Sequence, residues 1–363
     1  MEGVFLKQIL FYLICMMFIT GCQFGKTDEI KQKTSDIEKI EKSNERAVPI
    51  EVFGEQSFIP VKSLTEITKG NAHYDPINKT LTIFIGDHQY YFIQGVPVIQ
   101  KNGLMVPGTV DNFMIFDNRS WLSKDFLINV LGLNVRINHD RALITNIETM
   151  KPKTNDVVTE VSYLGSVENV MNILSVLKSP IKQAKVDTVP SHLPGANRAY
   201  RNGVHEGMDW YGYSTGVPMN PETEVFAMGD GVVVRADHSY NRYKSIKERN
   251  NELRIAYETG FTPAYILDRL RGRQVWIQYE NGLQARFAHL DRVPKNLQVG
   301  DMVTADTLIG FVGNSGTSGD VKNNQTEYHL HLDLLYRGEL FWKGLAASEI
   351  EKVLKTVFGN EKG

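Results

Sequence analysis

Residues 327–335 (EYHLHLDLL) alternate polar and apolar side chains in a pattern typical of a β-strand. Because alternate residues of a strand point to the same side, we expect His329, His331 and Asp333 to share one face. The Tyr and Leu side chains between them are expected on the other face. Histidine and carboxylate side chains are the groups that bind zinc or transfer protons in enzymes. This strand is therefore the centre of a candidate functional site.

Two further motifs carry the same residue types. Residues 205–209 read HEGMD and residues 286–290 read RFAHL. His205 and Asp209 have a spacing that fits a helix, but two nearby glycines favour a loop or tight turn. Each motif alone is common, yet four of the nine histidines in the chain fall in these three motifs. Together they indicate one zinc site, which in an enzyme has three protein ligands and a water.

The three motifs, in this order, resemble those of the M23 (lysostaphin/LytM-type) zinc endopeptidases of bacterial cell walls. The family pattern is His-x-(Gly)-x-Asp, then His-Leu at the end of a strand, then His-x-His. Its glycine-rich segments correspond here to residues 225–233 and 310–319. The resemblance covers residues 189–345 and implies an antiparallel β-sheet with a groove. The fold class expected for the whole chain is mainly β with added helices (α+β).

The resemblance also implies a role for each site residue. His205, Asp209 and His331 would bind one Zn²⁺, and His289 and His329 would be the catalytic pair. One of the pair would accept a proton and the other would stabilise the oxyanion; the sequence leaves open which does which. Asp333 has two interpretations: an acceptor that orients a ligand histidine, or a solvent-facing strand residue. The only cysteines, Cys15 and Cys22, lie at the N-terminus, so a Cys-type zinc site is not expected.

The function implied is a zinc-dependent endopeptidase that hydrolyses peptide bonds in bacterial peptidoglycan, during cell-wall remodelling or lysis. One alternative is a catalytically silent LytM-like adaptor that activates another wall hydrolase or scaffolds an envelope complex, because some relatives have lost ligands. Another is a protein whose main role is structural binding to the wall. All five site positions are filled here, which favours the enzyme.

Residues 1–22 are typical of an export signal. An uncharged, largely apolar run from Ile9 to Ile19 follows Lys7, and it is too short to span a membrane. The run ends in Ile19–Cys22 (ITGC), which resembles a bacterial lipoprotein signal with Cys22 acylated. A plain cleaved signal and an uncleaved anchor are the alternatives. We expect an extracytoplasmic protein, lipid-anchored to the cell membrane, followed by a flexible, charged tether at residues 23–47.

Residues 48–148 contain a weak internal repeat. Each half predicts a strand, a short helix ended by a glycine and a hairpin of two strands, and a further hairpin at residues 83–93 lies between them. The helices are expected at residues 62–68 and 124–131. This pattern resembles the copper amine oxidase N-terminal-like "stalk" domain of bacterial surface proteins. It implies a smaller α+β domain that acts as a spacer or wall-binding module, without a copper site.

Residues 149–188 predict a linker with one amphipathic helix, capped by Ser166, that docks on one of the domains or regulates the site. Residues 346–363 predict a C-terminal amphipathic helix. The net charge of −2 gives no basic field that would argue for nucleic acid. The expected partners are therefore peptidoglycan and, through Cys22, the membrane.

Residues 238–273 interrupt the M23 pattern. They predict two helices, Tyr243–Tyr257 and Thr262–Leu270, with Thr262 as the N-cap of the second. The insertion is rich in Arg and Lys. It is either a lid that selects an anionic substrate or a helical decoration away from the groove.

Overall fold

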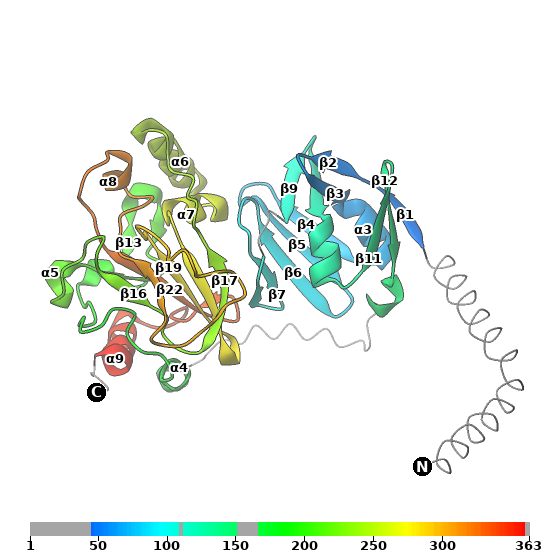
Figure 1. Ribbon diagram of the computed structural model, residues 1–363. Helices are drawn as coiled ribbons and strands as arrows, with labels where there is room; N and C mark the ends of the chain where they lie inside the picture. Colours follow the sequence, from blue (N-terminus) through cyan, green and yellow to red (C-terminus); the bar gives the residue numbers. More distant parts are fainter. Residues whose placement is uncertain (1–44, 109–111, 151–165, 360–363) are drawn as a thin grey trace, which may run out of the picture.

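The computed structural model describes residues 45–108, 112–150 and 166–359, which form two lobes side by side (Figure 1). All strand pairs in these ranges are antiparallel, and helices cover parts of the sheets, so the expected fold class is confirmed. The expected lipidation site Cys22 and nearly all of the tether lie outside the described residues. In the ranges described, no helix combines the length and the apolar character needed to cross a membrane.

The N-terminal lobe contains the two strand–helix–hairpin units expected from the repeat. The first unit consists of β3 (Gln56–Pro60), α3 (Val61–Thr68), β4 (Asn71–Asp75) and β5 (Thr80–Ile85). The second consists of β10 (Arg119–Ser123), one π-helical turn (Phe126–Val130), β11 (Asn134–Asn138) and β12 (Arg141–Thr145). The two units pair through β3 and β10. The hairpin expected between them is formed by β5 and β6 (His88–Ile93).

Three sheets build this lobe. Their strand orders are β4-β5-β6-β7-β8, β2-β3-β10-β9 and β1-β12-β11. The additional strands are β1 (Arg46–Pro49), β2 (Glu51–Phe53), β7 (Ile99–Lys101), β8 (Leu104–Val106) and β9 (Phe113–Phe116). Since β1 begins at Arg46 and pairs with β12, the last residues of the expected tether belong to the lobe.

The expected glycine stop of the first helix needs a correction. Lys69, not Gly70, takes the left-handed conformation after α3, with φ 55°. Gly70 is required for another reason, because a Cβ there would lie 2.4 Å from the carbonyl oxygen of Phe84. The second stop is as expected, since Gly132 has φ 69°.

The C-terminal lobe is built on one sheet with the order β15-β22-β19-β18-β17-β20, and β23 pairs with β22. Its strands are β15 (Met208–Trp210), β17 (Gly231–Ala236), β18 (Val275–Tyr279), β19 (Leu283–Ala288), β20 (Met302–Val303), β22 (Leu330–Tyr336) and β23 (Glu339–Leu340). A small second sheet pairs β16 (Glu224–Phe226) with β21 (Leu308–Phe311). One face of the main sheet is apolar and forms the core, as Leu330, Leu332 and Leu334 illustrate.

Two helices complete this core. The helix expected in the linker is α4 (Val167–Leu174), and the Ser166 hydroxyl caps it by accepting a hydrogen bond from the Asn169 amide. Val170 and Leu174 are fully buried in the C-terminal core, and each contributes about 1.5–3 kcal/mol by leaving water. The other helix is α9 (Ala347–Phe358), which packs beside α4. The linker helix thus docks on the C-terminal lobe.

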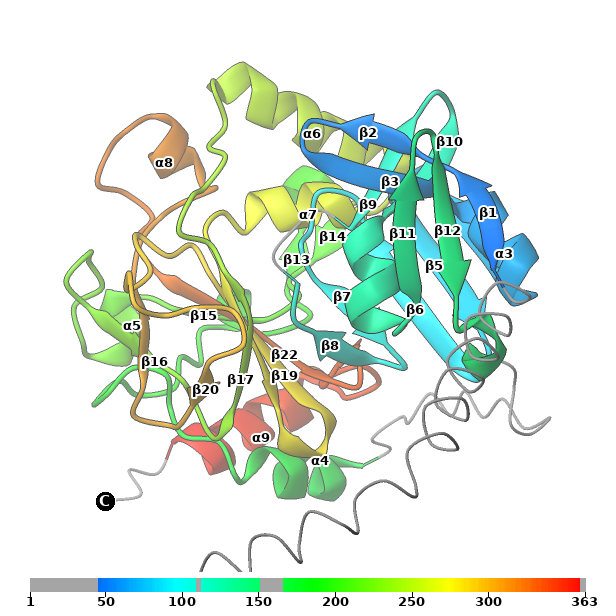
Figure 2. The same ribbon diagram turned by 45° about the vertical axis from the view of Figure 1, so that its right-hand side comes forward.

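The opposite face of the same sheet carries both the candidate site and the contact with the N-terminal lobe. His331, Asp333 and Leu335 follow one another on this face of β22. Leu335, Val234 and Trp276 form an apolar cluster with three N-terminal residues, Val96, Val98 and Met105. The Gln278 side-chain oxygen accepts a hydrogen bond from the Met105 amide at 2.8 Å. Figure 2 shows β8 lying against this end of the sheet.

Met105→Asp is expected to separate the two lobes. Met105 is 3% exposed in the apolar cluster, and an unpaired carboxylate costs several kcal/mol to bury. Small-angle X-ray scattering of the full-length chain would show the larger radius of gyration. Leu104→Asp on the same strand is the matched control, because Leu104 is 40% exposed. An unchanged radius in Met105→Asp would mean that this cluster does not hold the lobes together.

The insertion contains two helices, as expected, but both predicted starts are wrong. Helix α6 (Ile246–Thr259) begins after Ser245, whose hydroxyl accepts a hydrogen bond from the Glu248 amide. Helix α7 (Ala264–Leu270) begins directly after Pro263. The Thr262 hydroxyl does not cap it; instead it accepts a hydrogen bond from Arg201 at 2.7 Å. A tertiary contact has taken the place of the local cap.

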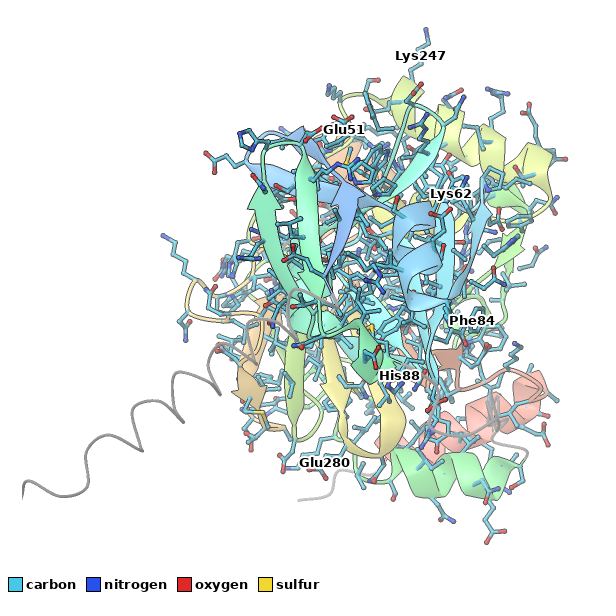
Figure 3. All side chains as sticks on the ribbon, turned by 90° about the vertical axis from the view of Figure 1, so that its right-hand side faces the viewer. Glu51, Lys62, Phe84, His88, Lys247 and Glu280 are labelled. Carbon is cyan, nitrogen blue, oxygen red and sulfur yellow. The ribbon has the colours of Figure 1, made fainter. Side chains whose placement is uncertain are left out.

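The insertion also contacts the N-terminal lobe. The Ala264 amide donates to the side chain of Asn78 at 3.1 Å, and the Lys79 ammonium lies 4.0 Å from the centre of the Tyr265 ring. Lys247 projects from α6 away from the body of the protein (Figure 3). Helix α7 therefore bridges the lobes, while part of α6 faces solvent.

Candidate metal centre

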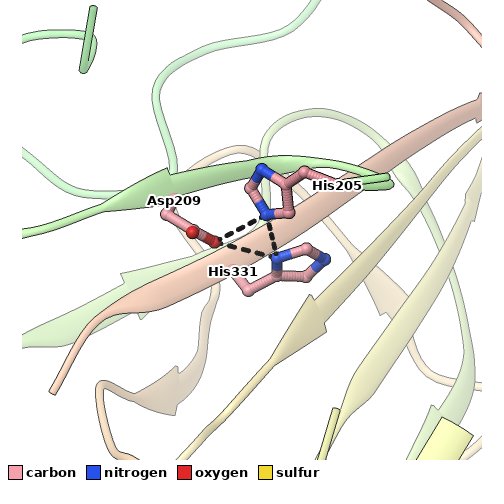
Figure 4. A group of neighbouring side chains, drawn as sticks. All are labelled: His205, Asp209 and His331. Atoms are coloured by element: carbon pink, nitrogen blue, oxygen red, sulfur yellow. Dashed lines mark hydrogen bonds and ion pairs between the residues drawn. The ribbon is translucent and has the colours of Figure 1, made fainter. Parts of the chain in front are cut away.

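Three side chains converge on one point from separate parts of the C-terminal lobe (Figure 4). His205 lies in the turn after β14 (Gly203–Val204), Asp209 on β15, and His331 opposite Asp209 on β22. The Nε2 atom of His205 is 3.0 Å from Oδ1 of Asp209 and 3.0 Å from Nδ1 of His331. Oδ1 of Asp209 and Nδ1 of His331 are 2.9 Å apart. The motif at residues 205–209 is a turn leading into a strand, not a helix.

The other ring nitrogen of each histidine is already occupied. Nδ1 of His205 donates to the carbonyl oxygen of Leu193 at 3.1 Å, and Nε2 of His331 donates to Asp333 at 2.7 Å. In neutral rings, the two nitrogens that face each other then each carry a lone pair, and both lie beside a carboxylate oxygen. Only a shared proton or a cation between them removes their repulsion. Two imidazole nitrogens and one carboxylate are a donor set that zinc accepts, so the residues fit a metal ion.

The charges around the centre favour the binding of a cation by these three side chains. Burial lowers the pKa of His331, but Asp333 and Asp209 outweigh it and raise the pKa to about 9. Burial raises the pKa of Asp209, but His205 and His329 hold it well below the usual value. Asp209 is therefore ionised, and a metal ion that binds would take the place of the proton on the inner nitrogen of His331.

His289 and His329 stand beside this donor set. Their ring centres are 4.5 Å apart, and Nε2 of His329 is 3.7 Å from Oδ1 of Asp209. Nδ1 of His289 donates to the carbonyl oxygen of Ser315, and Nδ1 of His329 donates to that of Glu327, both at 2.7 Å. Burial lowers the pKa of both rings, and the neighbouring histidines lower that of His289 further. Both rings are thus neutral near pH 7, with Nε2 free to accept a proton.

Backbone geometry holds both side chains in place. His289 directly follows β19 and has a left-handed φ of 59°, which is uncommon outside glycine. Its amide donates to the carbonyl oxygen of Arg271 at 2.8 Å. His329 directly precedes β22 and bridges to Gly313. The structure thus brings together all five residues that the motifs single out.

Residues 204–341 match the sequence profile of peptidase family M23. This part of the chain is an M23 peptidase domain. The match covers less than half of the chain and does not include the N-terminal lobe. No curated protein matches the chain.

Several solved structures are similar to it. One is a zinc-containing peptidase from Vibrio cholerae, with 13% identity and a TM-score of 0.27, over 72% of this chain and 48% of that one. Another is the catalytic domain of the antimicrobial peptidase lysostaphin from Staphylococcus simulans, with 19% identity and a TM-score of 0.23, over 51% and 91%. A third is a mutant catalytic domain of the M23 protein EnpA from Enterococcus faecalis, with 17% identity and a TM-score of 0.26, over 45% and 91%.

Asp333 in the M23 domain is fully buried and does not face solvent. It accepts from His331 and pairs with Arg271 at 2.6 Å. Burial raises the pKa of Asp333, but Arg271 and His331 outweigh it and hold the pKa far below the usual value. Arg271 directly follows α7, at the end of the insertion. The motif spacing did not reveal it, because the contact joins residues far apart in the sequence.

Asp333→Asn is expected to weaken zinc binding by about 10–100-fold, the usual effect of losing a carboxylate behind a ligand histidine. The amide cannot accept the His331 proton and pair with Arg271 as a carboxylate does. Competition with a fluorescent chelator would measure the affinity. Asp306→Asn, at an exposed position, is the control. Equal affinities of the two variants would show that Asp333 does not support the centre.

Two aromatic side chains of the domain were not anticipated. The Tyr211 ring stacks on His329 at 4.5 Å with an interplanar angle of 9°. His192 packs against the same tyrosine, and its Nδ1 atom is 2.7 Å from Asp187. The Asp-Trp-Tyr run at residues 209–211 was the available signal for Tyr211, while nothing local distinguished His192. Tyr211 therefore packs against one side of the His329 ring, and His192 packs behind Tyr211.

A cavity of about 580 Å³ contains the site. Its walls include Arg249 and Leu253 of α6, Leu267 and Leu270 of α7, and Tyr200 before the first motif. The interpretation of the insertion as a decoration away from the groove is therefore wrong. Both helices contribute to the space in which a substrate of the M23 domain would lie.

Proposed function

We propose that this chain is a zinc-dependent endopeptidase that hydrolyses peptide bonds of bacterial peptidoglycan, with one Zn²⁺ bound by His205, Asp209 and His331. The observation that carries the proposal is the pair of neutral histidines beside a three-donor set in one cavity. A structural zinc site usually has four protein ligands, whereas this centre brings together three, the number typical of catalytic zinc sites.

Zinc at this centre would supply Lewis acidity and a bound water with a pKa near 7. The side chains of the chain then have distinct tasks. Nε2 of one histidine of the His289–His329 pair accepts a proton from the attacking water and passes it to the leaving amine. The other, once it has taken up a proton on Nε2, would donate that hydrogen to the carbonyl oxygen as negative charge develops there. Their Nδ1 hydrogen bonds to Ser315 and Glu327 keep both rings in the orientation that these tasks need.

Peptidoglycan as the substrate is supported by the match to the M23 family and by the export signal expected at residues 1–22. Arg249 of α6 lines the cavity and forms no ion pair with a carboxylate of the described residues, so its charge suits a carboxylate-bearing peptide. Acylation of Cys22, membrane attachment and wall binding by residues 48–148 stay predictions.

The test uses the full-length chain on purified peptidoglycan, with the released fragments identified by mass spectrometry. New peptide termini that disappear with a chelator and with His289→Ala are the expected result. Release of sugar fragments alone would point to a different reaction. No release from zinc-loaded, folded protein across several wall types would favour the catalytically silent adaptor.

A further inference from the structure

A second cavity of about 760 Å³ lies where the N-terminal lobe meets the face of the sheet that carries the metal centre. Its lining comes from both lobes, with Gln89, Tyr91 and Gln100 on one side and Arg271, Arg286 and Leu335 on the other. The volume falls in the range of about 300–1,000 Å³ that is typical of small-ligand pockets. Glu206, Leu267 and Arg271 line both cavities, so the two spaces are neighbours.

Among the residues that the structure describes, no hydrogen bond or ion pair explains the burial of Arg286 in this cavity. It lies on β19 opposite Asp333 and Trp276, and it is 9% exposed. Its guanidinium carbon is 4.3 Å from the centre of the Trp276 ring. Nε is buried without a hydrogen-bond partner, and no carboxylate among the described residues forms an ion pair with this side chain.

The charges of Asp333 and Asp268 favour the cationic form of Arg286, but both carboxylates are bound to other side chains. Asp333 is bound by His331 and Arg271, and Asp268 pairs with Arg235 at 2.5 Å. Burial and the charge of Arg271 lower the pKa of Arg286 to about 10, so it stays a cation near pH 7. Asp333 and Asp268 offset only part of the cost of burying this cation, because the pKa stays below its usual value. An anion bound directly to Arg286 would reduce the remaining cost.

We propose that Arg286 binds the free carboxylate of a peptide in this second cavity. The inference rests on the proposed function, since it takes the peptide to be a peptidoglycan stem. One face of the guanidinium lies against Trp276, and its edge can form two parallel hydrogen bonds to a carboxylate. The amides of Gln89 and Gln100 can hydrogen-bond peptide groups.

The chemistry of the walls favours a carboxylate over a phosphate. Asp87, Glu206 and Glu339 also line the cavity, and their charges oppose a dianion. Glu206 already pairs with Arg201 and Glu339 with Lys343. Arg337 lies on the wall beside the Tyr336 ring, so the buried guanidinium that a single carboxylate would pair with is that of Arg286. Stem peptides with a free carboxylate would therefore bind next to the catalytic cavity, and cross-linked or amidated stems would bind less well.

The test is calorimetric titration of the full-length chain, treated with chelator so that no hydrolysis occurs. The probes are a synthetic stem peptide with a free C-terminal carboxylate and the same peptide as its C-terminal amide. We expect the amide to bind about tenfold or more weakly, the effect of losing a charge-assisted hydrogen bond. Arg286→Gln should weaken binding of the acid by a similar factor. Arg254→Gln is the matched control, since Arg254 is exposed on α6 and pairs with Glu258.

Two further arms keep the test decisive. Arg286→Lys retains the charge and is expected to keep the preference for the acid. If Arg286→Gln does not fold, the comparison of acid and amide on the unaltered chain decides. Equal affinity for acid and amide, or acid binding that Arg286→Gln leaves unchanged, would overturn the inference. Binding of inorganic phosphate without binding of the peptide would overturn it in favour of a phosphate site.

Failure of this inference is distinguishable from failure of the proposed function. The titration needs no hydrolysis, and the peptidoglycan assay needs no knowledge of the second cavity. Hydrolysis without a preference for the acid rejects only the Arg286 site. A preference for the acid without hydrolysis rejects only the endopeptidase.

Discussion

His289→Ala is expected to lower the rate of peptide hydrolysis by about 10²–10⁴-fold, the usual contribution of a general acid–base group, while the chain keeps its zinc. The reason is geometric. His289 is not one of the three side chains whose donor atoms meet at the centre, but its ring lies 4.5 Å from His329 and 5.7 Å from His331. Initial rates and the zinc content by mass spectrometry, measured on the same preparation, would show that the rate falls while the zinc stays bound.

His331→Ala is the comparison for this prediction. It removes a donor atom that lies 2.9 Å from Asp209 and 3.0 Å from His205. We expect both the bound zinc and the hydrolysis to be lost. Loss of zinc from His289→Ala as well would contradict the assignment of His289 to the catalytic pair and make it a ligand. Unchanged hydrolysis in His289→Ala would leave the proton transfer to His329 alone.

Gly207→Ala is expected to have the largest effect on folding. A Cβ at this position would lie 2.1 Å from the carbonyl oxygen of Leu332 and 2.7 Å from Asp333. Both atoms belong to β22, the strand that carries His331, so relief of the clash moves a ligand strand. We expect the free energy of unfolding to fall by about 3 kcal/mol, with a melting temperature roughly 6–12 °C lower. Calorimetry with and without added zinc would measure both effects.

Gly229→Ala is the matched control for this change. The nearest atom to a Cβ at Gly229 would be a side-chain carbon of Leu177 at 3.4 Å, and the Val176 carbonyl oxygen would follow at 3.7 Å, both ordinary contacts. Its melting temperature should stay within a few degrees of the unaltered chain, as is usual for substitutions without a clash. A Gly207→Ala variant that melts like Gly229→Ala and still binds zinc would show that the turn and β22 can move apart without harm.

Local patterns in the sequence were sufficient for much of this protein. The alternation in residues 327–335 placed His331 and Asp333 on one strand face, because every second side chain of a strand points to the same side. The apolar spacing and the Ser166 cap predicted α4 for similar reasons. The histidines and the carboxylate of the three motifs indicated a zinc site before any geometry was known, since few other side chains bind that metal, and the resemblance to M23 peptidases implied His205, Asp209 and His331 as its ligands.

The local patterns failed where a distant partner changes the outcome. Thr262 has the residue type of an N-cap, yet its hydroxyl binds Arg201, and α7 begins later. Lys69 takes the left-handed position expected of Gly70, because Gly70 is needed for a close approach of strands. The preference of a single residue for a helix position is worth little free energy, and a buried hydrogen bond or a steric contact outweighs it.

The sequence by itself determined the residue types of the centre, histidines and a carboxylate that can bind a metal or carry a proton, while their division into ligands and a catalytic pair is what the resemblance to M23 peptidases implies. Only the tertiary structure decided what surrounds them. It brings Arg271 from the insertion to Asp333, stacks Tyr211 on His329, and sets the N-terminal lobe on the same sheet face, where Arg286 forms no ion pair with any described residue. The physical reason is that donor chemistry belongs to the single residue, whereas burial and pairing depend on which distant segments the folded chain brings into contact.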